Sequence, residues 1–67
     1  MQDYLIGCDS DTHYHTIQAN SLTSAKAKCS KFYYINFNSL LIVAIKDGDD
    51  IAILSSKRGY GRWDDKK

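Results

Sequence analysis

The chain has 67 residues, which is enough for one domain with a modest core and too short for an enclosed catalytic pocket. Its composition, 43% hydrophobic and 25% charged, is that of a folded globular domain and excludes a disordered tail. The net charge of +1 hides a segregation, because all eight acidic residues lie outside residues 12–46, where four lysines stand. Such a distribution favours a negatively charged partner.

The chain shows no targeting or membrane signal. The N-terminus, residues 1–4, lacks the basic and apolar regions of a signal peptide. The longest apolar run, residues 40–45, is far shorter than a membrane span. Two cysteines are too few for a disulfide framework, so we expect a reduced cytoplasmic protein without membrane contact.

The first third of the chain predicts a strand hairpin. Residues 4–8 are mostly apolar and form a short strand, and the polar residues 9–11 form a turn. Residues 12–19 alternate and are rich in β-formers, which indicates a second strand.

The periodicity then becomes that of a helix. Asn20 or Ser21 can cap its N-terminus through a side-chain oxygen. A single apolar stripe follows at helical spacing, formed by Leu22, Ala25, Cys29 and Phe32. We expect the helix to end near Phe32 or Tyr33 and Phe32 to lie in the core.

The second half predicts the centre of a sheet. Residues 39–46 are apolar on both faces, which is typical of a central strand. Residues 46–50 form a hairpin loop in which Gly48 can take a positive φ, and residues 51–54 return as the partner strand. A polar turn over 55–61 and a last short strand over 62–64 complete the chain.

These elements predict a single α+β domain covering residues 1–67. Its fold is a small antiparallel sheet of four to five strands with one helix packed on one face. The order is β-β-α-β-β-(β).

The lysines of the helix are the first candidate binding residues. Lys26 and Lys31 lie off the apolar stripe, and no acidic residue stands nearby to form the usual i,i+4 pairs. They form either a solvated face or a docking surface. Tyr33 and Tyr34 are adjacent, so one of them should be exposed beside Lys31 as an interface anchor.

Residues 57–63 are the second candidate. Three cations, Lys57, Arg58 and Arg62, alternate there with aromatic residues and glycines. Arginine recognises carboxylate or phosphate, and exposed aromatic rings stack on bases or anchor an interface. The alternative is an ordinary turn in which Trp63 closes the core. We expect Trp63 to be partly buried in either case.

Metal binding and catalysis are not favoured. His13 and His15 point to the same side of a strand, but Cys8 and Cys29 are too far apart in sequence for a typical zinc pair. Cys29 also lies on the apolar stripe, where it acts as a small hydrophobic residue. No nucleophile stands beside an evident base. We therefore expect no metal, no cofactor, no small-molecule substrate and no enzymatic activity.

Two strings of the sequence resemble a known family. The first is Ala19-Asn20-Ser21-Leu22-Thr23-Ser24-Ala25-Lys26 with Ser30-Lys31, and the second is Lys57 followed by Arg62-Trp63-Asp64. Both are similar to the small phage anti-CRISPR proteins of the ninth type I-F family. The resemblance covers about two thirds of the chain, from Ile17 onward.

This resemblance implies an inhibitor in the host bacterial cytoplasm that works by binding. Its partner would be the type I-F RNA-guided surveillance complex, on the repeated Cas backbone subunit that displays the guide. Bound there, it would block hybridisation of target DNA, with at most an indirect or non-specific contact to DNA. The family's basic contacts fall on Lys26, Lys31, Lys57 and Arg62, and a polar contact falls near Tyr33.

Two other functions stay open. A small nucleic-acid-binding module would use the same cations with Tyr60 and Trp63 as stacking platforms. A protein-interaction domain would dimerise through the second apolar face of residues 40–45.

Overall fold

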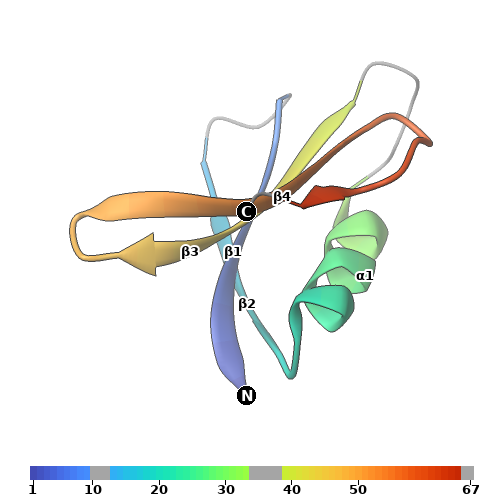
Figure 1. Ribbon diagram of the computed structural model, residues 1–67. Coiled ribbons are helices and arrows are strands. Elements are labelled where there is room, and N and C mark those ends of the chain that lie inside the picture. Colours follow the sequence, from blue (N-terminus) through green and yellow to red (C-terminus); the bar gives the residue numbers. More distant parts are fainter. Residues whose placement is uncertain (10–12, 34–38, 66–67) are drawn as a thin grey trace.

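The computed structural model describes residues 1–9, 13–33 and 39–65 (Figure 1). Within these residues, one helix and five strands form an α+β fold, which confirms the predicted class. The sheet is antiparallel throughout, with the strand order β2-β1-β3-β4-β5. The elements in chain order are β1 (Gln2–Cys8), β2 (His15–Ala19), α1 (Leu22–Phe32), β3 (Leu40–Asp47), β4 (Asp50–Arg58) and β5 (Asp64–Asp65).

The central position predicted for residues 39–46 is confirmed. β3 pairs with β1 on one side and with β4 on the other. The turn between β3 and β4 contains Gly48 with φ 64°, a value that suits a residue without a Cβ. β3, the strand with the clearest apolar pattern in the sequence, is therefore the central strand of the sheet.

The predicted turn over residues 55–61 is wrong for its first half. β4 continues through Lys57 and Arg58, which pair with Leu41 and Leu40. The extension has a physical reason. β3 is long, and the N–H and C=O groups along its whole length need hydrogen-bond partners on a neighbouring strand. The last strand correspondingly forms at Asp64–Asp65 instead of residues 62–64.

A β-bulge interrupts the pairing of β3 and β4. Val43 pairs with Ser55 and Ala44 pairs with Ile53, so Leu54 is the extra residue on β4. Leu54 packs against the core. The bulge keeps Ser55 and Lys57 on the same face of the sheet as Val43 and Leu41, because directly paired residues share a face.

The core lies between α1 and one face of the sheet. Its largest fully buried side chains include Ile6 of β1, Leu41 and Val43 of β3, and Cys29 of α1. Ala25 is also buried, and Leu22 packs against the same cluster. The predicted helix stripe is therefore confirmed at these positions.

The N-cap and the end of α1 lie where the sequence predicts them, but the side chain of Phe32 does not. Ser21 is the N-cap, and its Oγ accepts a hydrogen bond from the backbone N–H of Ser24 at 3.2 Å. Phe32 is 54% exposed, so the prediction that it enters the core is wrong. Its ring lies 4.9 Å from that of His15 on the edge strand β2, beyond the cluster of buried residues.

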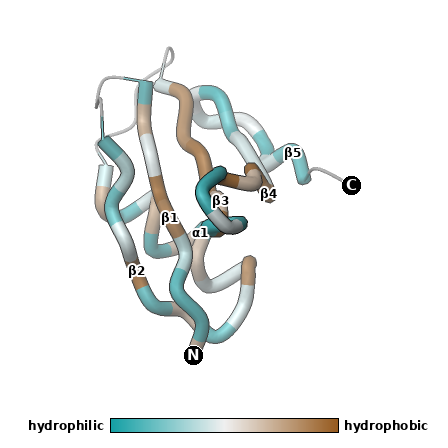
Figure 2. Tube along the Cα trace, turned by 90° about the vertical axis from the view of Figure 1, so that its left-hand side faces the viewer, coloured by the Kyte–Doolittle hydropathy of each residue, from teal (hydrophilic) through white to brown (hydrophobic). Residues whose placement is uncertain are grey.

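The other face of the sheet is apolar in its centre, with Lys46 and Arg58 toward its two ends. Strand alternation and pairing place six hydrophobic side chains there, and none of them belongs to the core cluster around α1. Figure 2 shows the hydrophobic stretch along β3 and the neighbouring parts of β1 and β4. We call this surface the open face; it consists of Leu5, Leu40, Ile42, Ala44, Ile51 and Ile53.

Candidate functional site

An ion pair joins α1 to the last strand. Lys26 Nζ lies 2.5 Å from Asp65 Oδ1, and the Lys26 side chain is only 16% exposed. The same carboxylate oxygen accepts a hydrogen bond from Oγ of Ser55 at 2.7 Å, and Ser55 is fully buried. The hydrogen bond from Lys26, and to a lesser extent that from Ser55, holds the pKa of Asp65 below its usual range. One carboxylate thus connects α1, β4 and β5.

A second contact closes the turn between β4 and β5. Lys57 pairs with Leu41 and therefore points to the α1 side of the sheet. Its Nζ lies 5.8 Å from the ring centroid of Trp63, within the range of a cation–π interaction. Trp63 packs against the core, which confirms the prediction that it is partly buried.

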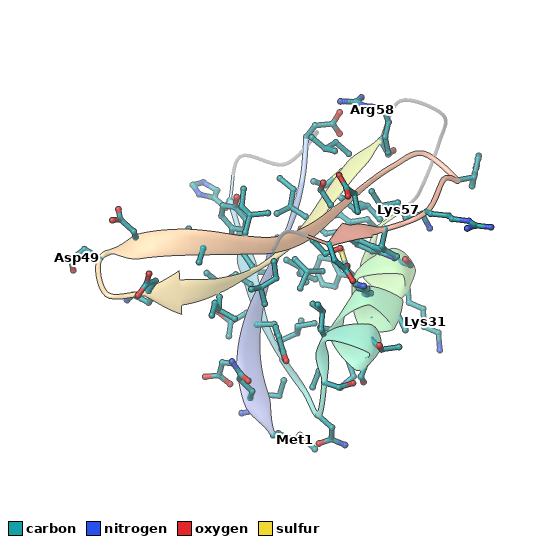
Figure 3. The ribbon with its side chains drawn as sticks, in the orientation of Figure 1. Met1, Lys31, Asp49, Lys57 and Arg58 are labelled. Atoms are coloured by element: carbon teal, nitrogen blue, oxygen red, sulfur yellow. The ribbon has the colours of Figure 1, made fainter. Side chains whose placement is uncertain are left out.

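The remaining predicted cations divide between the two sides of the sheet. Lys31 is exposed in the last turn of α1, and Arg62 is exposed in the turn that the Lys57–Trp63 contact closes. Figure 3 places Lys31 and Lys57 on the side of α1, away from Asp49 at the tip of the hairpin. Arg58 pairs with Leu40 and therefore points to the open face.

We call the set Lys26, Lys31, Lys57 and Arg62 the basic face. Its members come from two segments that are far apart in the sequence. The Lys26–Asp65 pair joins these segments, and the Lys57–Trp63 contact closes the turn within the second one. Two carboxylates, Asp64 and Asp65, lie in the same region, so cations exceed acids by two.

Tyr33 has a structural role. It is half-buried, and its hydroxyl donates a hydrogen bond to the backbone oxygen of Ile6 at 3.4 Å. Its ring also contacts that of Phe32 edge-on, with centroids 4.9 Å apart. The exposed aromatic residue that stands next to Lys31 is therefore Phe32, and Tyr34 lies outside the described residues.

The Cys29 thiol is poorly suited to nucleophilic chemistry. Cys8 and Cys29 are not joined in a disulfide, and both are buried. Burial, reinforced by the neighbouring Cys8, raises the pKa of Cys29 to about 12, although the nearby charge of Lys57 lowers it. A protonated thiol is a weak nucleophile. Within residues 1–9, 13–33 and 39–65, no three His, Cys, Asp or Glu side chains gather as metal ligands do.

Sequence reasoning missed the residues that shape this region. Asp65 and Ser55, which position β5, were not predicted, and Phe32 was expected in the core although it is 54% exposed. A signal for Asp65 was present, because acidic residues directly after the basic segment can pair with the lysines of the helix. No helix in the described part of the chain has the length and hydrophobicity needed to cross a membrane.

The comparisons with known proteins give no relative. No family model, curated protein or solved structure matches the chain. The likeness to the anti-CRISPR family therefore depends on the residues quoted from the sequence.

Proposed function

We propose that this chain is a non-enzymatic inhibitor that acts by binding through its basic face. The partner we propose is the Cas backbone subunit of the type I-F RNA-guided surveillance complex in the host bacterial cytoplasm. Binding there blocks hybridisation of target DNA to the guide. The resemblance in sequence suggests the partner, and the geometry of the basic face supports the mode of binding.

The observation that carries this proposal is the convergence of two distant segments. Two contacts fix the turn that holds Arg62. Lys57 lies over the ring of Trp63 and closes the turn, and Asp65, which follows it, pairs with Lys26 of α1. Lys31 and Arg62 are exposed, so they supply most of the accessible charge. A surface fixed in this way loses little conformational entropy when a partner binds.

The chemistry of the face suits a protein that handles nucleic acid. Exposed arginine and lysine can bind carboxylates of such a protein or phosphates of the guide RNA that it holds. Phe32, more than half exposed beside Lys31, adds an aromatic anchor at the edge of the face. A small rigid protein that covers such a surface can exclude DNA without any catalysis.

The test uses the purified surveillance complex. Wild-type protein is expected to co-elute with the complex in gel filtration and to prevent its binding of target DNA. Lys31→Glu combined with Arg62→Glu should remove both effects, while the far-UV circular dichroism spectrum stays that of the wild type. Lys46→Glu is the matched control, since Lys46 is an exposed cation close to the β3–β4 turn. Undiminished co-elution of the double variant would exclude the basic face as the surface that binds the complex.

A second function is favoured by one further observation. Tyr60 is 65% exposed between Arg58 and Arg62, an arrangement in which a base can stack on the ring. As a nucleic-acid-binding module, the isolated chain would bind free single-stranded DNA with a steep dependence on salt. Tyr60→Ala would then weaken binding by about 1–3 kcal/mol. If the isolated chain does not bind DNA even at low salt, the nucleic-acid-binding function is excluded.

A further inference from the structure

β5 covers only a small part of the outer edge of β4. It pairs with Ser55 and Ser56, whereas β4 runs from Asp50 to Arg58. Figure 2 shows β5 beside β4 at the edge of the sheet. Among the described residues, no strand pairs with the outer side of residues 50–54. The uncovered part of this edge carries backbone N–H and C=O groups with which a further strand can pair.

β5 is held in place by a site for one carboxylate. Oδ1 of Asp65 accepts hydrogen bonds from Oγ of Ser55 at 2.7 Å and from Nζ of Lys26 at 2.5 Å. We call these two donors the carboxylate site. Ser55 is fully buried and the Lys26 side chain is only 16% exposed, so the fold fixes the positions of both donors. In contrast, the side chain of Asp65 is 56% exposed, and its strand is two residues long.

The present occupant of the carboxylate site can be exchanged at low cost. Ion pairs with an exposed carboxylate contribute little to stability, and a two-residue strand adds few backbone hydrogen bonds. Trp63 packs against the core and lies within cation–π range of Lys57. The turn before β5 therefore stays closed when only residues 64–65 leave. A longer segment of another protein would pair with more of β4 than β5 does, which compensates for the loss of β5.

The two sides of this edge differ in chemistry. Ser55 faces α1, because it pairs with Val43 of the core. Ile51 and Ile53 face the opposite side and are 43% and 42% exposed. A strand that lies along the edge alternates its side chains between the two sides. An acidic residue opposite Ser55 would reach Lys26, and the residues next to it in sequence would pack beside the two isoleucines.

We propose that the outer edge of β4 binds an extended segment of another protein in which acidic and apolar residues alternate. One carboxylate of that segment replaces Asp65 on Lys26 and Ser55, and its backbone adds a strand along β4. Asp65 itself indicates this chemistry, because it occupies the site as a carboxylate on an antiparallel strand. β5 is thus an internal competitor that closes the site when no partner is present. Binding at this edge goes beyond the proposed inhibition and requires no surveillance complex.

Fluorescence anisotropy with the full-length chain tests the site. The probe is a short fluorescein-labelled peptide of alternating valine and aspartate. Asp65→Ala vacates the carboxylate site and should bind the probe roughly twofold to fivefold more tightly than the wild type does. Adding Lys26→Met to Asp65→Ala should abolish this gain, because the cation that meets the carboxylate is lost. Lys46→Met in the same background is the matched control, since Lys46 is exposed on the other side of the sheet.

A second peptide tests the chemistry of the partner without a further change in the protein. The same peptide with asparagine in place of aspartate should bind Asp65→Ala at least about threefold more weakly. Equal binding of the two peptides, or no gain from Asp65→Ala, would overturn the proposal. A wild-type dimer in sedimentation equilibrium that Asp65→Ala dissociates would assign the site to β5 of a second copy, and this result would also overturn it.

Discussion

The side chains of Lys26 and Asp65 lie 2.5 Å apart, from Nζ to Oδ1, and join α1 to the last strand of the sheet. Asp65 also accepts a hydrogen bond from the buried Ser55, so it connects three elements. Ion pairs with a solvent-exposed carboxylate contribute little to stability. The pair is therefore more important for the position of the turn that carries Arg62 than for overall stability.

Replacing Asp65 should loosen the end of the chain while leaving the rest intact. Asp65→Asn removes the negative charge that Lys26 meets, so β5 should separate from β4 more often. Amide hydrogen exchange of residues 64–65 should become faster, while exchange in β1 and β3 stays unchanged. Asp64→Asn is the control on the neighbouring exposed carboxylate. Equal protection of residues 64–65 in both variants would show that the ion pair does not hold β5.

The same carboxylate should make stability depend on pH. Its pKa is lowered in the fold, first by Lys26 and then by Ser55. Its contribution is therefore complete above the pKa of the unfolded chain and is lost as pH falls through the lower folded value. Urea unfolding between about pH 5 and pH 2 should show a steeper loss of stability for the wild type than for Asp65→Asn. Parallel curves would contradict this role.

Cys29 should be unreactive in the folded protein. Its pKa is about 12, so almost no thiolate exists near neutral pH. In a Cys8→Ala background, a thiol reagent at pH 8 should modify Cys29 only as fast as the chain unfolds. Adding denaturant should restore the rate of a free thiol. Rapid modification in native buffer would show that Cys29 is accessible.

Alkaline pH gives a second measurement on Cys29. A thiol pKa raised from 9.0 to about 12 contributes stability that is complete below pH 9 and is lost as pH rises toward 12. The loss attributable to this thiol is at most about 1.4 kcal/mol per pH unit. Cys29→Ala should lack this component of the alkaline decline, which denaturant unfolding at several pH values would reveal.

Gly7 and Tyr14 should be energetically coupled. A Cβ at position 7 would approach Cε1 and Cδ1 of Tyr14 to 2.9 and 3.0 Å, so the ring must move. Gly7→Ala is expected to cost about 1–3 kcal/mol in the wild type. The cost should be smaller in a Tyr14→Ala background, where the clash is absent. A double-mutant cycle measured by urea unfolding gives the coupling, and additive effects would contradict it.

Periodicity predicted most of this fold because the apolar residues recur with clear spacing. The alternation in residues 39–46 and the stripe of Leu22, Ala25 and Cys29 both follow from burial against the same core. Gly48 marked the hairpin because its positive φ favours glycine. These features depend on local sequence and on one hydrophobic layer.

The errors arose where tertiary pairing determines the structure. Ser55 to Arg58 are polar and look like a turn, yet β3 requires them as a paired strand. Phe32 has helical spacing, but the helix end extends over β2, where the ring stays exposed. The Lys26–Asp65 contact joins residues 39 positions apart, so the acidic residues after the basic segment hinted at a partner for the helix lysines without showing which of them pair.

The affinity of charge variants for the surveillance complex tests the central claim most directly. Isothermal titration calorimetry with the purified type I-F complex would compare the affinity of the wild type with the affinities of Lys31→Glu, Arg62→Glu and the double variant. If α1 and the β4–β5 turn form one binding surface, each reversal should weaken binding by about tenfold or more, and the double variant should lose still more. Equal affinities for all four proteins, or no binding by the wild type, would contradict it.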